Sequence, residues 1–218
     1  MKNNFIHLLG FTFLTLFILS LSIAVTINFR PLYAVIIDYL QITDIVDLSK
    51  EQILLNYRIL LDYLNTPWVN SLNMPNFPSS ASGLFHFFEV KKLFMLVYLI
   101  LIISGVGTVW FFQLLNRKRQ SWRLLPYFRW SMLIPLVVLL ALVVRFDTLF
   151  LLFHQVFFNN DAWLFNPATD PIILALPAEF FMHSFLLVFG LIEVSLVLSY
   201  LLVNKILQMN FSPINEFK

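Results

Sequence analysis

Two histidines with nearby carboxylates are the side chains in this sequence best suited to chemistry. His86 lies in the segment GLFHFFEVKK (83–92), and Glu89 follows it by three residues. On a helix this spacing allows the carboxylate to face the imidazole and hydrogen-bond it. His154 follows Asp147 by seven residues, which on a helix places both on one face, about 10 Å apart along the axis. That distance excludes a direct hydrogen bond, but both side chains could line one pocket.

Histidine can accept or donate a proton at neutral pH because its unperturbed pKa is about 6.5. A single histidine near a membrane surface is more often an anchor than a catalyst. Two histidines, each flanked by phenylalanines and each with a carboxylate nearby, make acid–base chemistry or ligand binding an equal alternative to that anchoring role. His86 and His154 are therefore the candidate catalytic residues.

Two other classes of protein fit the same residues. A metal-dependent membrane hydrolase could use His86 and His154 as ligands together with Glu89 or Asp147, although the sequence contains no HxxxH or HxH pair. A non-enzymatic lipid-binding or assembly protein would use its outer surface for docking and would not need the histidines.

The elements that carry these histidines are predicted to lie in or beside a membrane. Hydrophobic residues make up 60% of the chain and charged residues only 12%, whereas soluble proteins have about 25% charged residues. Four segments approach the roughly 20 apolar residues that a membrane helix needs. We therefore predict an all-α integral membrane protein, a single domain over 1–218, with transmembrane helices at about 5–29, 93–115, 124–144 and 180–203. Pro135 predicts a mild kink in the third helix.

Basic residues predict the orientation of these helices. The connection 116–123 reads NRKRQSWR, with four basic residues and no acidic one, which is typical of a cytoplasmic segment. An even number of spans then places both termini in the cytoplasm, where Lys2, Lys205 and Lys218 agree. His86 and His154 would lie at the opposite, outer face.

The two outer stretches, 30–92 and 145–179, are long enough to form an extracellular cap. Ser49 and Gln52 have the spacing of a helix capping box. Apolar residues from there to Leu64 recur at helical spacing, which predicts an amphipathic helix on the outer membrane surface. Residues 146–181 contain eight phenylalanines and Trp163 beside polar side chains. Such an aromatic wall suits a site for acyl chains.

These features together resemble the lipoprotein intramolecular transacylases, small four-span membrane proteins of Gram-positive bacteria with an extracellular cap. The resemblance covers essentially the whole chain. At the first histidine motif the family more often has aspartate where this chain has Glu89, a change that keeps the charge. The resemblance includes the cap helix Ser49–Leu64, the segment HFFEVK at 86–91, and residues 147–154 with Asn160, Trp163 and Pro177 downstream.

The resemblance implies a reaction. The family moves the sn-2 acyl group of a diacylglyceryl lipoprotein to the α-amino group of that lipoprotein's own N-terminal cysteine. The product is an N-acyl, S-monoacylglyceryl lipoprotein, the lyso-form. His86 and His154 match the family's catalytic histidines, and the resemblance implies a bacterial cell membrane with the active site outside. Supporting or substrate-binding roles would fall to Glu89, Asp147, Asn160 and Trp163.

The residues suit this reaction independently of the resemblance. The substrate's amine is the nucleophile, so the enzyme needs a base and a hydrogen-bond donor rather than a serine or cysteine of its own. Either histidine could fill either role. The chain contains no cysteine, which excludes a cysteine nucleophile and thiolate metal sites, and its net charge of +2 does not indicate nucleic acid. We expect no metal or cofactor, and we expect membrane lipid and a diacylglyceryl lipoprotein as partners.

Overall fold

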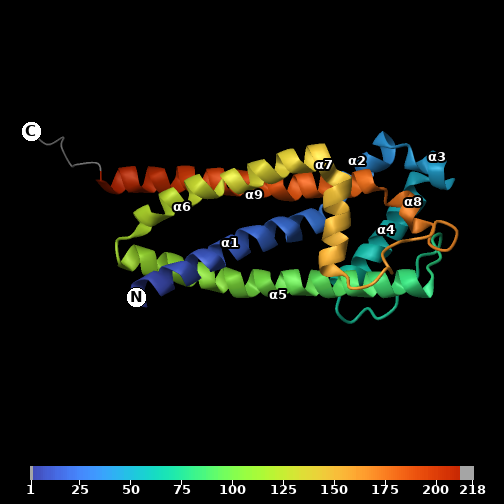
Figure 1. Cartoon of the computed structure of the whole chain (residues 1–218), viewed down its shortest axis with the longest axis horizontal. Helices are drawn as coiled ribbons and strands as arrows, with labels where there is room; N and C mark the ends of the chain where they lie inside the picture. The colour runs from blue at the N-terminus through green and yellow to red at the C-terminus, as the bar shows by residue number, and fades with distance from the viewer. Residues whose placement is uncertain (1, 212–218) are drawn as a thin grey trace, which may run out of the picture. The chain divides into compact units, whose positions relative to one another are not determined.

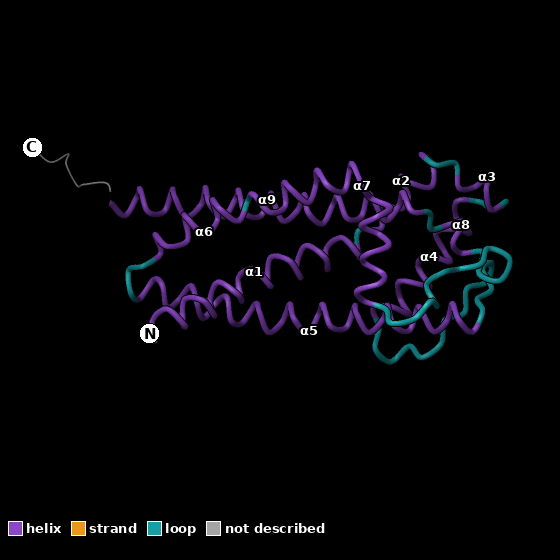
Figure 2. Tube along the Cα trace, viewed as in Figure 1, coloured by secondary structure: helices purple, strands orange, loops and turns teal. Residues whose placement is uncertain are grey.

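The computed structural model describes residues 2–211; Met1 and residues 212–218, including Lys218 and the C-terminus expected in the cytoplasm, lie outside the described part. The described residues form helices joined by turns and loops, without a β-strand among them (Figure 2). In chain order they are α1 (Lys2–Asn28), α2 (Arg30–Tyr39), α3 (Ile42–Val46), α4 (Lys50–Asn65), α5 (Ala81–Arg117), the 3-10 helix η1 (Ser121–Arg123), α6 (Leu124–Ser131), α7 (Leu133–Phe157), α8 (Ile172–Ala175) and α9 (Ala178–Phe211). Figure 1 labels the α-helices.

The predicted all-α membrane fold is confirmed. Four helical stretches in the described chain are long and apolar enough to cross a membrane, namely 4–28, 81–117, 121–157 and 178–209. The third of these combines η1, α6 and α7. Pro135 lies in the first turn of α7, where proline is tolerated because its missing N–H has no helical partner. The non-helical residue inside α7 is Arg145 instead, with φ −141° and ψ 39°.

Residues of the chain form two compact units. The first unit comprises the described parts of 1–22, 100–141 and 187–218, and the second comprises 23–99 and 142–186. Close helix packing in the first unit depends on two glycines. A Cβ atom at Gly10 would lie 2.1 Å from the ring of Phe111, and one at Gly107 would lie 2.4 Å from the ring of Phe13. These contacts leave no room for a side chain at either position.

The second unit contains the cap helices, and α4 begins as predicted. The side chain of Ser49 accepts a hydrogen bond from the N–H of Gln52, whose own side chain accepts from the N–H of Ser49. The predicted apolar stripe of α4 is buried in the protein core of this unit rather than lying on a membrane surface. The rings of Tyr33 and Tyr57 contact each other in the same core with centroids 4.1 Å apart, and the Tyr33 hydroxyl donates to the carbonyl of Ala175. Burial raises the pKa of Tyr57 to about 12.

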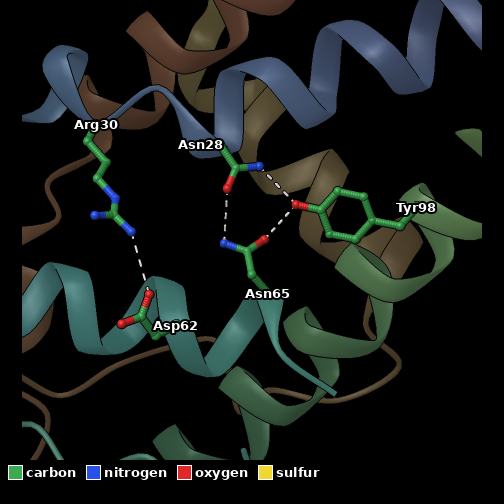
Figure 3. Close-up of polar contacts among 5 residues, drawn as sticks. All are labelled: Asn28, Arg30, Asp62, Asn65 and Tyr98. Carbon is green, nitrogen blue, oxygen red and sulfur yellow. Dashed lines mark hydrogen bonds and ion pairs between the residues drawn. The ribbon is translucent and has the colours of Figure 1, made fainter. Parts of the chain in front are cut away.

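A closed polar network joins α1, α4 and α5 in the second unit (Figure 3). The Asn28 amide donates to the Tyr98 hydroxyl at 2.9 Å, and that hydroxyl donates to Asn65 Oδ1 at 2.6 Å. The Asn65 amide closes the ring by donating to Asn28 Oδ1 at 3.3 Å. Nearby, Arg30 and Asp62 form an exposed ion pair at 3.5 Å, which is expected to contribute little. The network therefore attaches the cap helix α4 to the helix that carries His86.

Removing the hydroxyl at the centre of this network should destabilise the protein. Tyr98→Phe removes the two bonds of the hydroxyl, to the Asn28 amide and to Asn65 Oδ1, and leaves only the 3.3 Å bond between the two asparagines. This loss should lower the free energy of unfolding by about 1 kcal/mol. Thermal unfolding in detergent measures the change as a lower melting temperature. Tyr39→Phe is the matched control, because the Tyr39 side chain is 71% exposed and its hydroxyl makes no hydrogen bond to any residue in 2–211. Equal melting temperatures for the two variants would show that the network contributes nothing.

Candidate active site

His86 and His154 lie together in the second unit. His86 is in the second turn of α5. The Ser80 side chain caps the start of this helix by accepting a hydrogen bond from the N–H of Gly83. His154 is near the end of α7, beyond the break at Arg145. The two ring centroids are 6.1 Å apart, and each side chain is 8% exposed. The structure thus brings together two imidazoles that are 68 positions apart in sequence and buries both.

The hydrogen bond of His154 determines which of its nitrogens carries the proton. Its Nδ1 lies 2.7 Å from the carbonyl oxygen of Phe150. A carbonyl only accepts hydrogen bonds, so Nδ1 must donate, and in the neutral ring Nε2 then has a free lone pair. His86 differs, because its Nδ1 is buried without a hydrogen-bond partner among residues 2–211. His154 is therefore prepared to accept a proton, and His86 retains a free polar atom in a buried position.

Aromatic side chains enclose both imidazoles. Phe158 contacts both rings, with centroids 4.7 Å from His86 and 5.6 Å from His154. Phe165 packs edge-on against His86 with centroids 5.4 Å apart, and the Trp163 ring lies tilted against His154 at 4.6 Å. Phe165 and Trp163 come from the loop after α7, the aromatic segment expected to bind acyl chains. These rings exclude water from the histidines and leave an apolar environment.

The Glu89 carboxylate is held by Asn160 rather than by His86. The Asn160 amide donates to both carboxylate oxygens of Glu89, each at 3.1 Å, and its own Oδ1 accepts from the N–H of Ala162 at 2.9 Å. That second bond fixes the orientation of the amide. The pair thus fastens the loop that carries Trp163 to α5, one turn beyond His86. The structure gives no hydrogen bond between Glu89 and His86, the contact that their spacing allowed.

Exchanging donor and acceptor tests this contact. Asn160→Asp places two carboxylates together and should cost about 2 kcal/mol of stability, because bonds to a charged group are replaced by repulsion. Adding Glu89→Gln restores one donor and one acceptor, while an aspartate at 160 still accepts from Ala162. We expect melting temperature and activity to fall in the single variant and to recover largely in the double variant. Additive losses would show that the two side chains do not act as a pair.

Asp147 is not brought to the histidines. Its side chain is exposed, and within the described chain it makes no hydrogen bond or ion pair. Two turns of helix separate it from His154, as the spacing indicated. Six residues were considered from sequence. The ring of His154 lies near those of His86 and Trp163, and Glu89 and Asn160 form a pair. Asp147 stands apart.

Asp170 is a buried carboxylate that the sequence interpretation did not assign to the site. It is 3% exposed and accepts hydrogen bonds from the Ser80 N–H and the Thr169 hydroxyl. It also lies so close to Gly83 that a Cβ atom there would be 2.2 Å from its Oδ1. Burial opposes ionisation, but the hydrogen bonds outweigh it and lower the pKa of Asp170. The carboxylate thus fixes the start of α5, one turn before His86. The partners are 90 positions apart, so no local motif indicates the contact.

The donor geometry does not fit a metal site. Among the residues that the structure describes, no three histidine, aspartate or glutamate side chains come close enough to share an ion. The two histidines would supply only two ligands, because Glu89 is bonded to Asn160 and Asp147 is exposed. The metal-dependent hydrolase is therefore not supported by these residues.

The fold is that of a membrane-integral protein, and its buried histidine pair consists of side chains that can accept or donate a proton. Residues 8–181 match the model of the family described as lipoprotein intramolecular transacylase Lit. The chain belongs to this family, as its sequence resemblance implied, and is an acyltransferase.

Solved structures of the family match almost the whole chain. A structure of the membrane-integral lipoprotein intramolecular transacylase Lit from Bacillus cereus has a TM-score of 0.91 and 29% sequence identity, covering 96% of this chain and 97% of that one. Two variants of the same Bacillus cereus protein, with a histidine replaced by arginine or by alanine, each match with a TM-score of 0.84 and 29% identity over 96% of this chain. The match covers 93% of the arginine variant's chain and 95% of the alanine variant's chain. None of the curated proteins compared with the chain matches it.

Proposed function

We propose that this chain moves the sn-2 acyl group of a diacylglyceryl lipoprotein to the α-amino group of the lipoprotein's N-terminal cysteine, with His154 as general base and His86 as hydrogen-bond donor. The observation that carries the proposal is the buried histidine pair, in which the Phe150 carbonyl leaves Nε2 of His154 free to accept a proton. The family membership supplies the reaction, and the hydrogen bond of His154 supports the assignment of roles.

In the first step the substrate amine attacks the carbonyl carbon of the sn-2 ester. A nitrogen–carbon bond forms, the carbonyl oxygen becomes an oxyanion, and the amine proton moves to Nε2 of His154. In the second step the bond between that carbon and the glyceryl oxygen breaks, and the proton on His154 passes to the departing oxygen. The amide and the glyceryl hydroxyl together contain all the atoms of the reactant, so water is neither consumed nor released.

His86 is assigned the role of donating a hydrogen bond to the oxyanion. A neutral imidazole donates through one nitrogen, and in a buried site a donor directed at developing charge stabilises the transition state far more than it would in water. No direct hydrogen bond links the two rings, yet their centroids are close enough for both to contact atoms on one carbon. This geometry suits a donor and a base acting on a single tetrahedral intermediate.

The aromatic enclosure limits hydrolysis. Phe158, Phe165 and Trp163 cover the histidines, so few water molecules can compete with the amine for the ester carbon. Because amine and ester belong to one molecule, the enzyme mainly has to hold them at attack distance. Glu89 and Asn160 act as positioning residues in this proposal, since they hold the loop with Trp163. Asp147 has no role in it.

The same charge pattern that predicts orientation supports a location for the site. The basic segment 116–123 favours the cytoplasm, which assigns both termini to that side and His86 and His154 to the extracellular face of a bacterial cell membrane. Lipoproteins carry their diacylglyceryl group at that face.

A crossover experiment tests the reaction. Purified protein is given two diacylglyceryl lipopeptides of different peptide mass, of which only one carries a deuterated sn-2 acyl chain. We expect mass spectrometry to find deuterium in the N-acyl product of that peptide alone. Label released as free fatty acid would identify a hydrolase, and label exchanged between the peptides would identify an intermolecular transferase; either result would contradict the proposal.

A further inference from the structure

A cleft of about 430 Å³ lies in the first unit, at the junction of α1, η1, α6 and the start of α7. Most of its wall is apolar. Trp130 and Ile134 are 68% and 67% exposed, and lie on helices of the membrane-crossing stretch. The lining residues are Phe11, Arg123, Pro126, Tyr127, Trp130, Ser131 and Ile134. The cleft therefore combines one permanent positive charge with surfaces suited to hydrocarbon.

The polar side of the cleft is formed by Arg123. Its Nε is buried and has no hydrogen-bond partner within residues 2–211, and its guanidinium group lies over the ring of Trp122 at 5.2 Å. Four more basic residues lie within six positions of it, and residues 116–131 include no acidic residue. Among the described residues, the ion pairs join Arg30 with Asp62 and Lys50 with Asp38, so no carboxylate pairs with any of these five bases. The positive charge here is uncompensated within the described protein.

The wall of the cleft is held in place by contacts of its own. The Tyr127 ring stacks on Phe11 with centroids 4.7 Å apart, and its hydroxyl shares a hydrogen bond of 2.9 Å with Thr15. These contacts join α6 to α1 and do not need a ligand. A bound molecule would thus meet a wall that is already ordered, which reduces the entropic cost of binding.

We propose that this cleft binds one anionic phospholipid, whose phosphate pairs with Arg123 and whose acyl chain lies along Trp130 and Ile134. Arginine is suited to phosphate because its planar group donates two parallel hydrogen bonds. Basic pockets beside membrane helices are recognised sites for anionic headgroups. A soluble phosphate would use the arginine but would leave the apolar wall exposed. The site is separate from the proposed reaction and does not depend on it.

Native mass spectrometry of the full-length protein in detergent tests the proposal. The protein is titrated with phosphatidylglycerol, with phosphatidylcholine and with inorganic phosphate. We expect one tightly bound phosphatidylglycerol, with weaker binding of phosphatidylcholine and no binding of phosphate at the same concentration. Arg123→Gln should weaken phosphatidylglycerol binding about tenfold, the effect of losing one charged hydrogen bond. Phosphate binding as tight as the lipid, or no preference for the anionic lipid, would overturn the proposal.

Arg129→Gln is the matched control, because it removes the same charge from an exposed side chain in the same segment that does not line the cleft. It should change binding less than twofold by the same assay, as expected for an exposed charge. Equal losses of phosphatidylglycerol binding in the two variants would show that general surface charge attracts the lipid, and would overturn the proposed site. Ser131→Phe keeps every charge and fills the apolar side of the cleft, so it should also lose the lipid. If Arg123→Gln does not fold, retained binding by Ser131→Phe still contradicts the proposal.

Discussion

The His154→Ala protein is expected to form the lyso-form product about 10²–10⁴ times more slowly than the unaltered protein, the range that general base catalysis contributes. The substitution removes the nitrogen that accepts the amine proton, whereas the aromatic enclosure and the His86 ring remain. Initial rates with purified protein and a diacylglyceryl lipopeptide, read by mass spectrometry, measure the change.

His183→Ala is the matched control for this substitution. His183 lies in the same unit, and its Nδ1 has the same kind of bond as His154, at 2.7 Å from the Glu179 carbonyl four residues earlier. Its ring lies edge-on to that of Tyr39, with centroids 6.3 Å apart, and not against the rings of the site. We expect the control to retain nearly full activity. Comparable losses in both variants would show that an imidazole–carbonyl contact in a helix matters for folding and that His154 is not the base.

Substitutions at His86 are expected to separate a donor from a base. His86→Ala should reduce the rate about 10²–10³-fold, the cost of removing one oxyanion donor. His86→Gln keeps a side-chain N–H and should retain at least about ten times more activity than His86→Ala, an effect of one partly preserved hydrogen bond. At position 154 the glutamine and alanine variants should be equally slow, because an amide cannot accept the proton.

The opposite pattern would reverse the assigned roles. If glutamine rescued activity at position 154 and not at position 86, His86 would be the base. The same four variants, compared at equal protein concentration after a melting-temperature check, supply both comparisons. A pattern without rescue at either position would mean that each histidine transfers a proton.

The sequence allowed the fold class to be predicted because membrane helices are defined by local composition. Four long apolar segments and the capping box at Ser49 depend on residues that are neighbours in the chain. The exact helix limits depended on tertiary contacts. α5 begins at Ala81, before the predicted start at 93, and α7 extends to Phe157, beyond the predicted end at 144. His86 and His154 therefore lie on parts of these two helices that the hydropathy pattern left out.

The site was predictable where residue type alone indicates chemistry. His86 and His154 were chosen as candidates because few other side chains in this apolar chain can transfer a proton, and the structure places their rings close together. The contacts beside the histidines could not be predicted, since they join positions far apart: Asn160 bonds Glu89 across 71 positions, and Asp170 bonds Ser80 across 90. Local spacing instead suggested that Glu89 faces His86. The seven-residue spacing placed Asp147 and His154 on one helix, as the structure has them, but it could not show that the Asp147 side chain is exposed while His154 is buried.

The most direct test of the histidine pair is mass spectrometry of lipoprotein N-termini from bacterial cells whose only transacylase gene encodes this chain or its variants. Cells with the unaltered chain should contain N-acyl, S-monoacylglyceryl lipoproteins, and so should cells with His183→Ala. Cells with His86→Ala or His154→Ala, producing the same amount of membrane-inserted protein, should contain only the diacylglyceryl form. Normal amounts of the lyso-form in either of these two strains would contradict the account.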